Sequence, residues 1–345
     1  MFRGAYRIGM RKIRAHIQLK ALQSNAQTFR ALTNTRLCAV VKANAYGHGA
    51  EETVCALSNI ADCFAVSLLD EAKAIRVAAC GKDILILTPP TGIEDIYQAA
   101  TNGFILTVCD TAMARQVMAT AKKYRLFIRV HLKVNTGMNR YGMEWRQVEN
   151  ACKALSLCPF VQVEGIYSHI YHAQTAENQR ELFMQAVEIC RRYYPDAIAH
   201  ISATYGATLG KAFAMDMVRV GLGLYGYLPD TVDKKTASSL QLQKAMRVTA
   251  DVMSVRKYRY GGGGYGQPTW EQPPKSLTIK RVGYADGVLR KAEDGVCMDA
   301  TIVRGAIYGK QITVLDDADE VAKATGTIAY EVLCAATRRA EWIYE

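Results

Sequence analysis

The sequence predicts an α/β protein with two domains. These are a (β/α)8 barrel of the TIM type over residues 12–235 and a smaller, mainly β domain over residues 236–345. Short apolar runs alternate with amphipathic helical stretches up to about residue 225. Eight such β-then-α units suit a barrel better than a doubly wound open sheet. After about residue 235, helical periodicity is nearly absent and strand-like runs separated by Gly and Asp predominate.

The barrel elements can be read in order along the chain. Asp110 is a favoured N-cap for the predicted helix TAMARQVMATAKKY. A second predicted helix, ENQRELFMQAVEICRRYY, is expected to stop at Pro195. That second helix carries apolar residues at helical spacing, at Leu182, Phe183, Ala186, Val187 and Cys190. The eight predicted strands are LCAVVK (37–42), CFAVS (63–67), ILIL (84–87), FILTV (104–108), LFIRVHLKV (126–134), VQVEGIYS (161–168), AIAHIS (197–202) and MDMVRVG (215–221).

The second domain is predicted from a change in sequence pattern near YLPDTVDKKTASS, a polar stretch whose residues favour a break in regular secondary structure. Its strand-like runs are RVTADVMSVRKY, SLTIKRVGY, CMDATIVR and QITVLD. We interpret the run of glycines at 261–264 as a flexible turn, and we expect residues 1–11 to pack with the β domain.

Composition narrows the functional class. The net charge of +11 is spread along the chain, and the densest basic cluster lacks the interleaved aromatics that stack on bases, so we expect no nucleic-acid partner. The ten cysteines form no C-x-x-C pair and lie mostly in apolar runs, which indicates reduced thiols in a cytoplasmic protein. No signal peptide and no apolar stretch of about 20 residues is evident, so we expect no membrane association for the chain as given, which leaves open a longer, membrane-anchored protein. We expect no metal site.

Polar residues follow several predicted strands at the carboxyl end of the barrel, where chemistry is found in this fold. They are Lys42, Lys133, Ser168, His169, Thr204, Arg219 and Gly221. The loops ISATYGA (201–207) and RVGLGLYG (219–226) follow the last two strands, where a barrel usually binds phosphate. A lysine amine opposite a phosphate cradle indicates pyridoxal 5′-phosphate held as a Schiff base. His48, His172 and His200 are interpreted as core or structural residues.

The motif AVVKANAYGHG around Lys42 resembles the cofactor-binding motif of the alanine racemase family. Further motifs match that family in its order along nearly the whole chain. They are KVNTGMNRYG (133–142), GIYSHI (165–170), RVGLGLYG (219–226), VGYADG (282–287), CMD (297–299) and TIAYEV (327–332). The resemblance implies a barrel followed by a β domain, with pyridoxal 5′-phosphate as cofactor and a homodimer whose active sites are completed across the interface.

The resemblance also implies roles for individual residues. Lys42 would carry the cofactor and act as one base, and Tyr284 of a second subunit would be the opposite base. His169 would flank the cofactor and Arg219 would contact its pyridine nitrogen. The residues that would hold its phosphate are Tyr46, Thr204, Gly221, Leu222 and Tyr330.

Three further residues would serve the substrate, a small amino acid. Met298 of the second subunit would offer a backbone N–H to its carboxylate. Arg140 would orient that carboxylate and the phenolate of Tyr284. Lys133 would be a carbamylated lysine that positions Arg140. Racemisation removes a proton from one face of Cα and returns one to the other, and one base on each face does this directly.

Some positions depart from the commonest family pattern. Ala203 and Thr204 stand where an Asn-Ser pair is expected, Asn135 stands where Asp is frequent, and the glycines at 261–264 replace a more polar stretch. These changes remove no reacting group, so they bear on substrate preference and efficiency.

The first functional hypothesis is interconversion of L- and D-alanine for peptidoglycan. The alternative is a serine or broad-specificity racemase on the same scaffold, in which Asn tends to replace the residue at Tyr330. A third is a non-catalytic protein of vitamin B6 homeostasis, but such proteins lack a second β domain. A decarboxylase of this architecture would carry an acidic residue in place of Arg219.

Overall fold

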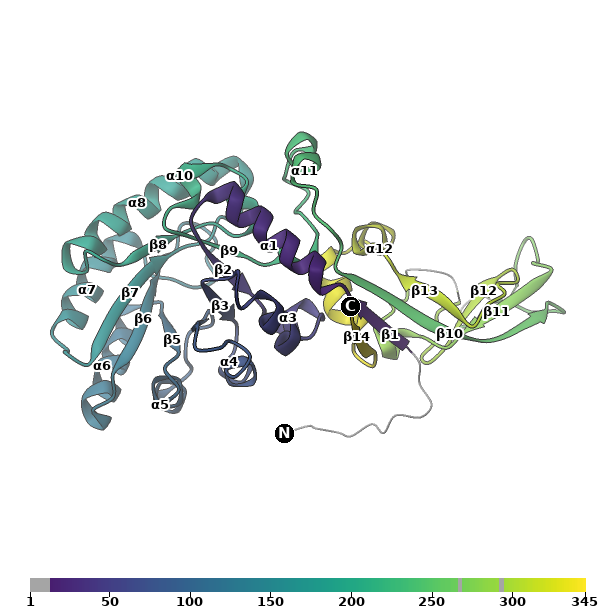
Figure 1. The fold of residues 1–345 in the computed structure, drawn as a ribbon, viewed down its shortest axis with the longest axis horizontal. Helices are drawn as coiled ribbons and strands as arrows, with labels where there is room; N and C mark the ends of the chain where they lie inside the picture. Colours follow the sequence, from purple (N-terminus) through teal and green to yellow (C-terminus); the bar gives the residue numbers. More distant parts are fainter. Residues whose placement is uncertain (1–12, 266–268, 292–294) are drawn as a thin grey trace. The chain divides into compact units, whose positions relative to one another are not determined.

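The computed structural model describes residues 13–265, 269–291 and 295–345. The chain forms two compact units (Figure 1). One contains residues 20–45 and 50–243 and is called the barrel unit below. The other contains residues 13–19, 46–49 and 244–345 and is called the second unit. The expected packing of residues 1–11 lies outside the described residues.

The barrel unit confirms the predicted (β/α)8 architecture. Its parallel sheet has the strand order β8-β7-β6-β5-β4-β3-β2-β9. Backbone hydrogen bonds from Asp216 to Ala199 and from Arg219 to Ser202, of 3.2 and 2.9 Å, join β9 to the chain at β8. The strands are β2 (Arg36–Val40), β3 (Cys63–Val66), β4 (Asp83–Ile86), β5 (Ile105–Val108), β6 (Ile128–Lys133), β7 (Val161–Tyr167), β8 (Ile198–His200) and β9 (Met217–Val220).

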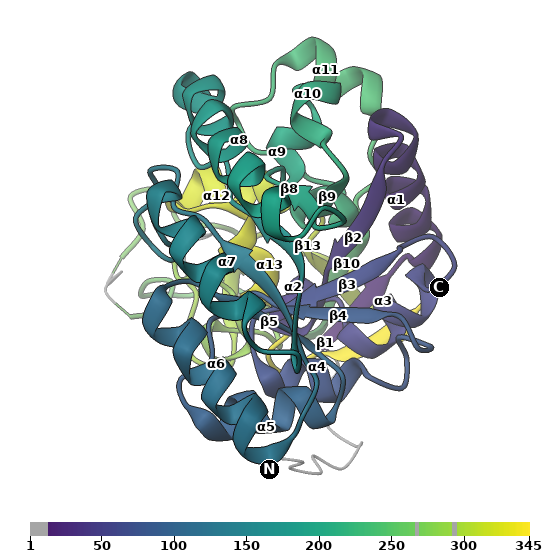
Figure 2. The same ribbon diagram turned by 90° about the vertical axis from the view of Figure 1, so that its left-hand side faces the viewer.

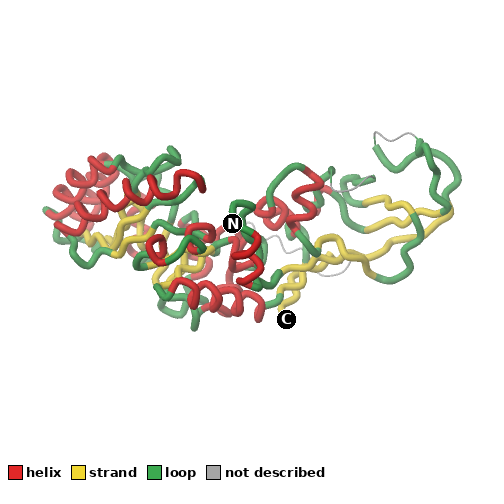
Figure 3. The backbone as a smooth tube through the Cα atoms, turned by 90° about the horizontal axis from the view of Figure 1, so that it is seen from above, coloured by secondary structure: helices red, strands yellow, loops and turns green. Residues whose placement is uncertain are grey.

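Helices surround these strands on the outside (Figure 2; Figure 3, red around yellow). Asp110 caps α6 as predicted, because its carboxylate accepts a 2.7 Å hydrogen bond from the Met113 N–H. Helix α8 ends at Tyr193, shortly before Pro195, and buries Phe183, whereas Leu182 is 38% exposed. The main helices are α1 (Leu19–Thr33), α3 (Ala50–Leu57), α4 (Leu69–Ile75), α5 (Ile93–Thr101), α6 (Thr111–Tyr124), α7 (Val148–Ser156), α8 (Ala176–Tyr193) and α11 (Lys234–Leu240).

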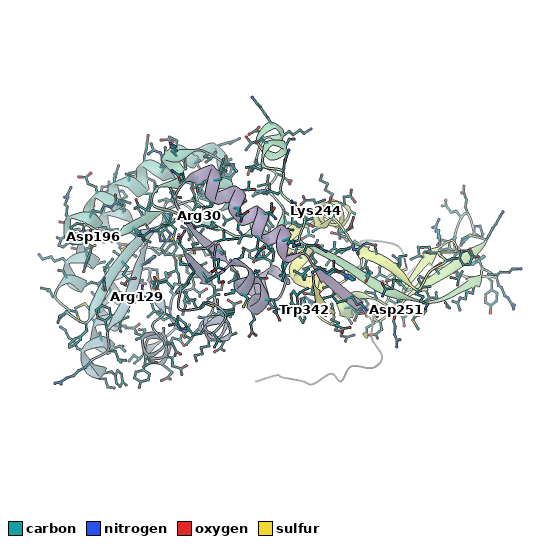
Figure 4. All side chains as sticks on the ribbon, viewed as in Figure 1. Arg30, Arg129, Asp196, Lys244, Asp251 and Trp342 are labelled. Atoms are coloured by element: carbon teal, nitrogen blue, oxygen red, sulfur yellow. The ribbon has the colours of Figure 1, made fainter. Side chains whose placement is uncertain are left out.

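Ion pairs link neighbouring elements at the amino-terminal end of the barrel. Arg129 on β6, labelled in Figure 4, donates from Nε to Glu164 at 2.7 Å and from one terminal nitrogen to Asp83 at 2.6 Å. These contacts tie β6 to β7 and β4. The Arg129 guanidinium holds the pKa of Asp83 below its usual range. This end of the barrel is therefore braced by ion pairs, and the polar residues singled out in the sequence lie at the other end.

The second unit is mainly β, as predicted. Its sheet has the order β12-β11-β10-β1-β14, and β13 also pairs with β10. The strands are β1 (Ile13–Ile17), β10 (Met246–Lys257), β11 (Ser276–Lys280), β12 (Thr301–Arg304), β13 (Gln311–Leu315) and β14 (Glu341–Tyr344). Two helices, α12 (Ala318–Thr325) and α13 (Ala329–Ala336), follow β13. The short segment 46–49 also belongs here, since Trp342 (Figure 4) donates to the Gly47 carbonyl at 2.9 Å.

Candidate active site

Lys42 begins a left-handed turn. The sequence predicted that Lys42 ends the first strand, but β2 ends at Val40 and Lys42 is the first residue of the turn α2 (Lys42–Tyr46). The four residues after Lys42 have φ angles of 51°, 53°, 54° and 53°. A left-handed backbone is unfavourable by about 1–2 kcal/mol for each non-glycine residue. Such strain persists only where the surroundings fix it and is typical of functional sites.

Hydrogen bonds hold this turn in the barrel unit. The Ala43 N–H donates to Glu71 at 2.7 Å, and the Ala50 N–H donates to the Asn44 side chain at 2.8 Å. The Tyr225 hydroxyl donates to the Val40 carbonyl at 3.0 Å, immediately before the turn. The chain therefore reverses sharply where Lys42 leaves the sheet, and this fixes the point from which its side chain extends.

Five basic residues of the barrel unit interact electrostatically at the carboxyl end of the strands. Burial lowers the pKa of His169 well below its ordinary value, and the neighbouring cations Arg219, Lys133, Arg140 and Lys42 lower it further. The pKa of Lys133 is likewise lowered, first by burial and then by Arg219 and Arg140. All the charged neighbours that shift these two groups are cations. Such a cluster is suited to an anionic ligand.

Arg219 is held by several buried hydrogen bonds. It is 4% exposed, and one terminal nitrogen donates to His200 Nδ1 at 2.7 Å and to the His200 carbonyl at 3.0 Å. The other terminal nitrogen donates to the Ser168 carbonyl at 2.7 Å. The guanidinium carbon lies 5.0 Å from the centre of the Tyr167 ring, which stacks on His200. His200, interpreted from sequence as a core residue, is therefore buried but directly bonded to the candidate site.

Asn135 organises the loop that carries Arg140. Its Oδ1 accepts from the N–H groups of Gly137 and Asn139, both at 3.1 Å, and its Nδ2 donates to Asn139 at 2.9 Å and to Glu144 at 3.2 Å. Only an amide can accept and donate in this way, whereas an ionised aspartate would only accept. Asn135 thus has a structural role in this chain that sequence reasoning missed. Asn side chains that bond nearby backbone groups are a known turn signal.

The small-residue loops form a tight cradle around Thr204. This residue is buried at the start of α9 (Thr204–Ala207), and its hydroxyl accepts a 3.1 Å hydrogen bond from the Gly223 N–H. Gly221 directly precedes the short helix η3 (Leu222–Tyr225). A Cβ atom added at Gly223 would lie 2.4 Å from the Phe29 ring, so no larger residue fits there. The structure therefore brings Thr204, Gly221 and Leu222 together.

In the second unit, Tyr46 lies beside Tyr330. Their ring centres are 5.9 Å apart. Burial raises the pKa of both phenols, and for Tyr46 the neighbouring Tyr330 and Cys334 raise it further. Both hydroxyls therefore stay protonated near neutral pH and can donate hydrogen bonds. Gly47 follows with φ of 85°, and a Cβ there would lie 2.5 Å from the Leu333 carbonyl oxygen.

Tyr284 and Met298 also come together in the second unit. The Tyr284 N–H donates to the Cys297 carbonyl and the Ala285 N–H donates to the Met298 carbonyl, each at 3.0 Å. Tyr284 begins η4 (Tyr284–Asp286) and is 40% exposed, while Met298 is 52% exposed. The unit therefore presents both residues at its surface.

A buried carboxylate fixes the Tyr284 turn. Asp286 Oδ2 accepts from the Gly283 N–H at 2.9 Å. Arg339 lies 3.5 Å from Asp286 and 2.9 Å from Asp299. A Cβ at Gly283 would lie 2.2 Å from the Cys297 carbonyl oxygen, which explains the glycine before Tyr284. Sequence reasoning missed Asp286 and Arg339, since only the folded chain brings Arg339 close.

Comparison with known proteins shows the family. Residues 17–229 match the family model described as alanine racemase, N-terminal domain, and residues 245–344 match the model described as alanine racemase, C-terminal domain. This chain belongs to the alanine racemase family. The predicted family and fold are thereby confirmed.

Individual family members resemble the chain over nearly its full length. The alanine racemase of Synechocystis sp. is 31% identical, with 92% of this chain and 95% of that protein covered. The biosynthetic alanine racemase of Pseudomonas aeruginosa has a solved structure with a TM-score of 0.86 and 28% identity, covering 97% of this chain and 100% of that one. A solved alanine racemase from Bartonella henselae, 23% identical with a TM-score of 0.85 over 97% and 99% of the two chains, contains covalently bound pyridoxal phosphate.

Among residues 13–265, 269–291 and 295–345, no helix has both the length and the apolar character that crossing a membrane requires.

Proposed function

We propose that this protein interconverts L-alanine and D-alanine with pyridoxal 5′-phosphate as cofactor, and so supplies D-alanine for peptidoglycan. The observation that carries the proposal is the left-handed turn that sets Lys42 among the basic residues His169, Lys133, Arg140 and Arg219. A reactive amine in a cationic site suits a phosphorylated aldehyde, and membership of the alanine racemase family supports the choice of reaction.

The residues present fit the cofactor. Thr204, Gly221 and Leu222 lie in two loops that are joined by the 3.1 Å hydrogen bond from the Gly223 N–H to the Thr204 hydroxyl. The backbone N–H groups of Gly221 and Leu222 would hold the phosphate there. The protonated phenols of Tyr46 and Tyr330 would donate further hydrogen bonds to that phosphate in the proposed site. When bound, the cofactor delocalises the negative charge left by removal of the Cα proton.

Arg219 would donate to the pyridine nitrogen of the cofactor. A guanidinium does not readily give up its proton, so this nitrogen would stay mostly unprotonated. The cofactor ring would then withdraw electrons from Cα less strongly than it would with an acidic residue at the pyridine nitrogen. This disfavours side reactions such as transamination. His169 would flank the cofactor, and it is neutral near pH 7 because burial and its cationic neighbours lower its pKa.

Two bases would exchange the proton. The Lys42 amine would take or return it on one face of Cα and the Tyr284 oxygen on the other. Tyr284 is exposed beside Met298 in the second unit, which supports a homodimer in which each subunit completes the site of its partner. The Met298 backbone N–H and the exposed Arg140 would hold the substrate carboxylate.

Lys133 is proposed to be carbamylated. Only a neutral amine adds to carbon dioxide, forming a C–N bond and releasing one proton. Lys133 meets this requirement because burial, Arg219 and Arg140 lower its pKa. The resulting anion would pair with Arg140 and relieve the repulsion among these cations. A carbonyl carbon signal after exchange with ¹³C-labelled carbon dioxide, lost in Lys133→Ala, is the measurement that checks this.

Alanine is proposed as the substrate over serine because Tyr330 is retained beside Tyr46. A small apolar pocket rejects an added hydroxyl poorly, so slow serine turnover is expected. We further propose a cytoplasmic location. The ten cysteines form no C-x-x-C pair and lie mostly in apolar runs, as in proteins of a reducing compartment.

A racemisation assay over a panel of L-amino acids, with and without added cofactor, tests reaction and substrate together. We expect alanine to be the best substrate and cofactor to be required; equal or faster turnover of serine would reassign the substrate. Lys42→Ala should abolish the visible absorbance of the cofactor-bound protein. A band that persists in this variant and is reducible by borohydride would overturn the assignment of Lys42.

The shared active site has its own test. Lys42→Ala and Tyr284→Phe subunits should each be inactive alone, but their mixture should regain activity because a heterodimer contains one intact site. If heterodimers form without regaining activity, each site is completed within one chain.

A further inference from the structure

We propose that His131 is a positioning residue for Arg219, acting through the ring of His200. The inference rests on the proposed contact of Arg219 with the cofactor. It concerns three buried side chains that are hydrogen-bonded in series, namely His131 on β6, His200 on β8 and Arg219 on β9.

The three side chains are directly hydrogen-bonded. His131 Nδ1 lies 2.9 Å from His200 Nε2, and His200 Nδ1 lies 2.7 Å from a terminal nitrogen of Arg219. His131 is 2% exposed and His200 is 0% exposed, so water does not replace these contacts. The Tyr167 ring is stacked on His200 at 4.9 Å with an interplanar angle of 3°, which keeps the imidazole in its plane.

Arg219 determines which ring nitrogens donate in this series of hydrogen bonds. A guanidinium only donates, so His200 Nδ1 must accept and carries no proton. A neutral imidazole has one N–H, which places the His200 proton on Nε2, where it donates to His131 Nδ1. His131 must then carry its own proton on Nε2. Burial lowers the pKa of His131 to about 3 and lowers that of His200, so both rings are neutral near pH 7.

His131 supports this tautomer from the other side of the ring, because its Nδ1 accepts from His200 Nε2–H. If its Nδ1 acceptor were removed, the buried His200 Nε2–H would lose its partner, which is unfavourable by about 1–3 kcal/mol. His200 could then lower its free energy by placing the proton on Nδ1 or by turning its ring. Either change removes the acceptor from Arg219. The guanidinium would keep only carbonyl partners and lose its defined direction.

The backbone opposite His131 holds its ring in place. Residue 165 on β7 pairs with His131, at a point where the register between the strands shifts. A Cβ at Gly165 would lie 2.8 Å from both Cε1 and Nε2 of His131. Gly165 does not have a positive φ angle, so an alanine there would be resisted by the imidazole and not by its own backbone. The glycine thus provides the space in which His131 accepts from His200.

The test uses the cofactor-loaded enzyme with ¹⁵N-labelled histidine. In the wild type, the ring-nitrogen signals of His200 should show the Nε2–H tautomer. His131→Leu should change or broaden them, and the cofactor dissociation constant should rise about tenfold. His131→Asn keeps an acceptor oxygen near the place of Nδ1, so it should restore both the His200 signals and the cofactor dissociation constant of the wild type. His172→Leu, the same change at an exposed histidine, is the matched control and should alter neither.

Gly165→Ala provides a second perturbation that leaves all three side chains in the sequence. It should move the His131 ring and change the His200 signals in the same direction as His131→Leu. An unchanged His200 tautomer in both His131→Leu and Gly165→Ala would overturn the proposal. So would a loss in His131→Asn equal to that in His131→Leu.

A further variant separates this proposal from the role of Arg219. With ¹⁵N in the cofactor ring, Arg219→Lys should shift the pyridine nitrogen signal, and His131→Leu should shift it less. If Arg219→Lys leaves this signal unchanged while His131→Leu still alters His200, the assigned cofactor contact fails and positioning of Arg219 by His131 stands.

Discussion

Two pairs of candidate functional residues, one pair in each unit, are held in opposite ways. In the barrel unit, Arg219 and Lys133 are 4% and 7% exposed, and Arg219 is fixed by hydrogen bonds to neighbouring strands. In the second unit, Tyr284 and Met298 are 40% and 52% exposed, and backbone hydrogen bonds join the turn at Tyr284 to the segment at Cys297 and Met298. Burial tunes protonation at Lys133 in the barrel unit, as it does at Tyr46 and Tyr330 in the second unit, whereas Tyr284 and Met298 lie at the surface.

The largest effect is expected from an exposed residue of the second unit. Tyr284→Phe removes a proposed base and leaves the turn intact, because the contacts of that turn are made by the backbone and Asp286. We expect kcat for L-alanine to fall about 10³-fold, within the range for loss of a general base. Tyr308→Phe, at an 86% exposed phenol, is the control. Wild-type rates in both directions would remove Tyr284 from the mechanism.

The next effect tests the packing of segment 46–49 within the second unit. Gly47→Ala combines a φ of 85° with a Cβ placed 2.5 Å from the Leu333 carbonyl, and should lower the free energy of unfolding by about 3 kcal/mol. Gly81→Ala has a similar φ of 81° but open space around the added carbon, and should be less destabilising. Chemical denaturation measures both. Equal losses would show that backbone strain alone decides the outcome.

Acid should weaken the barrel unit through its buried histidines. In the folded protein the pKa values of His131, His169 and His200 lie below the unfolded value of about 6.5. The fold keeps these histidines neutral, so their contribution to stability is fully present above that pH. As pH falls below 6.5, unfolding binds protons and the free energy of unfolding drops by up to about 1.4 kcal/mol per pH unit for each histidine. Denaturation series between pH 7 and 4.5 measure this slope. Replacing His131 with Asn should reduce it.

The smallest effect concerns loop order near the site. Asn135→Ala removes the side chain that receives the Gly137 and Asn139 N–H groups and should raise KM for alanine about fivefold, with little change in kcat. Asn135→Asp keeps the acceptor and should lie between alanine and wild type. A KM unchanged in Asn135→Ala would mean that Arg140 is positioned without this loop.

The sequence predicted the strands well because buried parallel strands are continuous apolar runs of limited length. The run 126–134 became β6 (Ile128–Lys133), and 215–221 became β9 (Met217–Val220). It did not predict the left-handed turn after Lys42, since Ala43 and Asn44 carry no signal for four consecutive positive φ angles. That conformation is imposed by contacts such as that of Ala43 with Glu71, which is distant in sequence.

Candidate site residues were predicted where a motif surrounds them, and missed where only tertiary structure gives them a role. His200 read as an ordinary core histidine because its partners, Arg219 and His131, lie on other strands. Asp286 and Arg339 likewise meet only after folding. Single-sequence patterns report on local periodicity, whereas a side chain's hydrogen-bond partner is a long-range property.

The segment 46–49 has a consequence for dissecting the protein. The chain leaves the barrel unit after Ala45, contributes four residues to the second unit and re-enters the barrel unit at Ala50. A single cut near residue 243 would therefore produce a barrel fragment that still carries a piece of the other half, with Gly47 deprived of the Trp342 indole. The two recombinant fragments would have to be produced together so that each completes the other. Exchanging the second unit between homologues would require exchanging residues 46–49 as well.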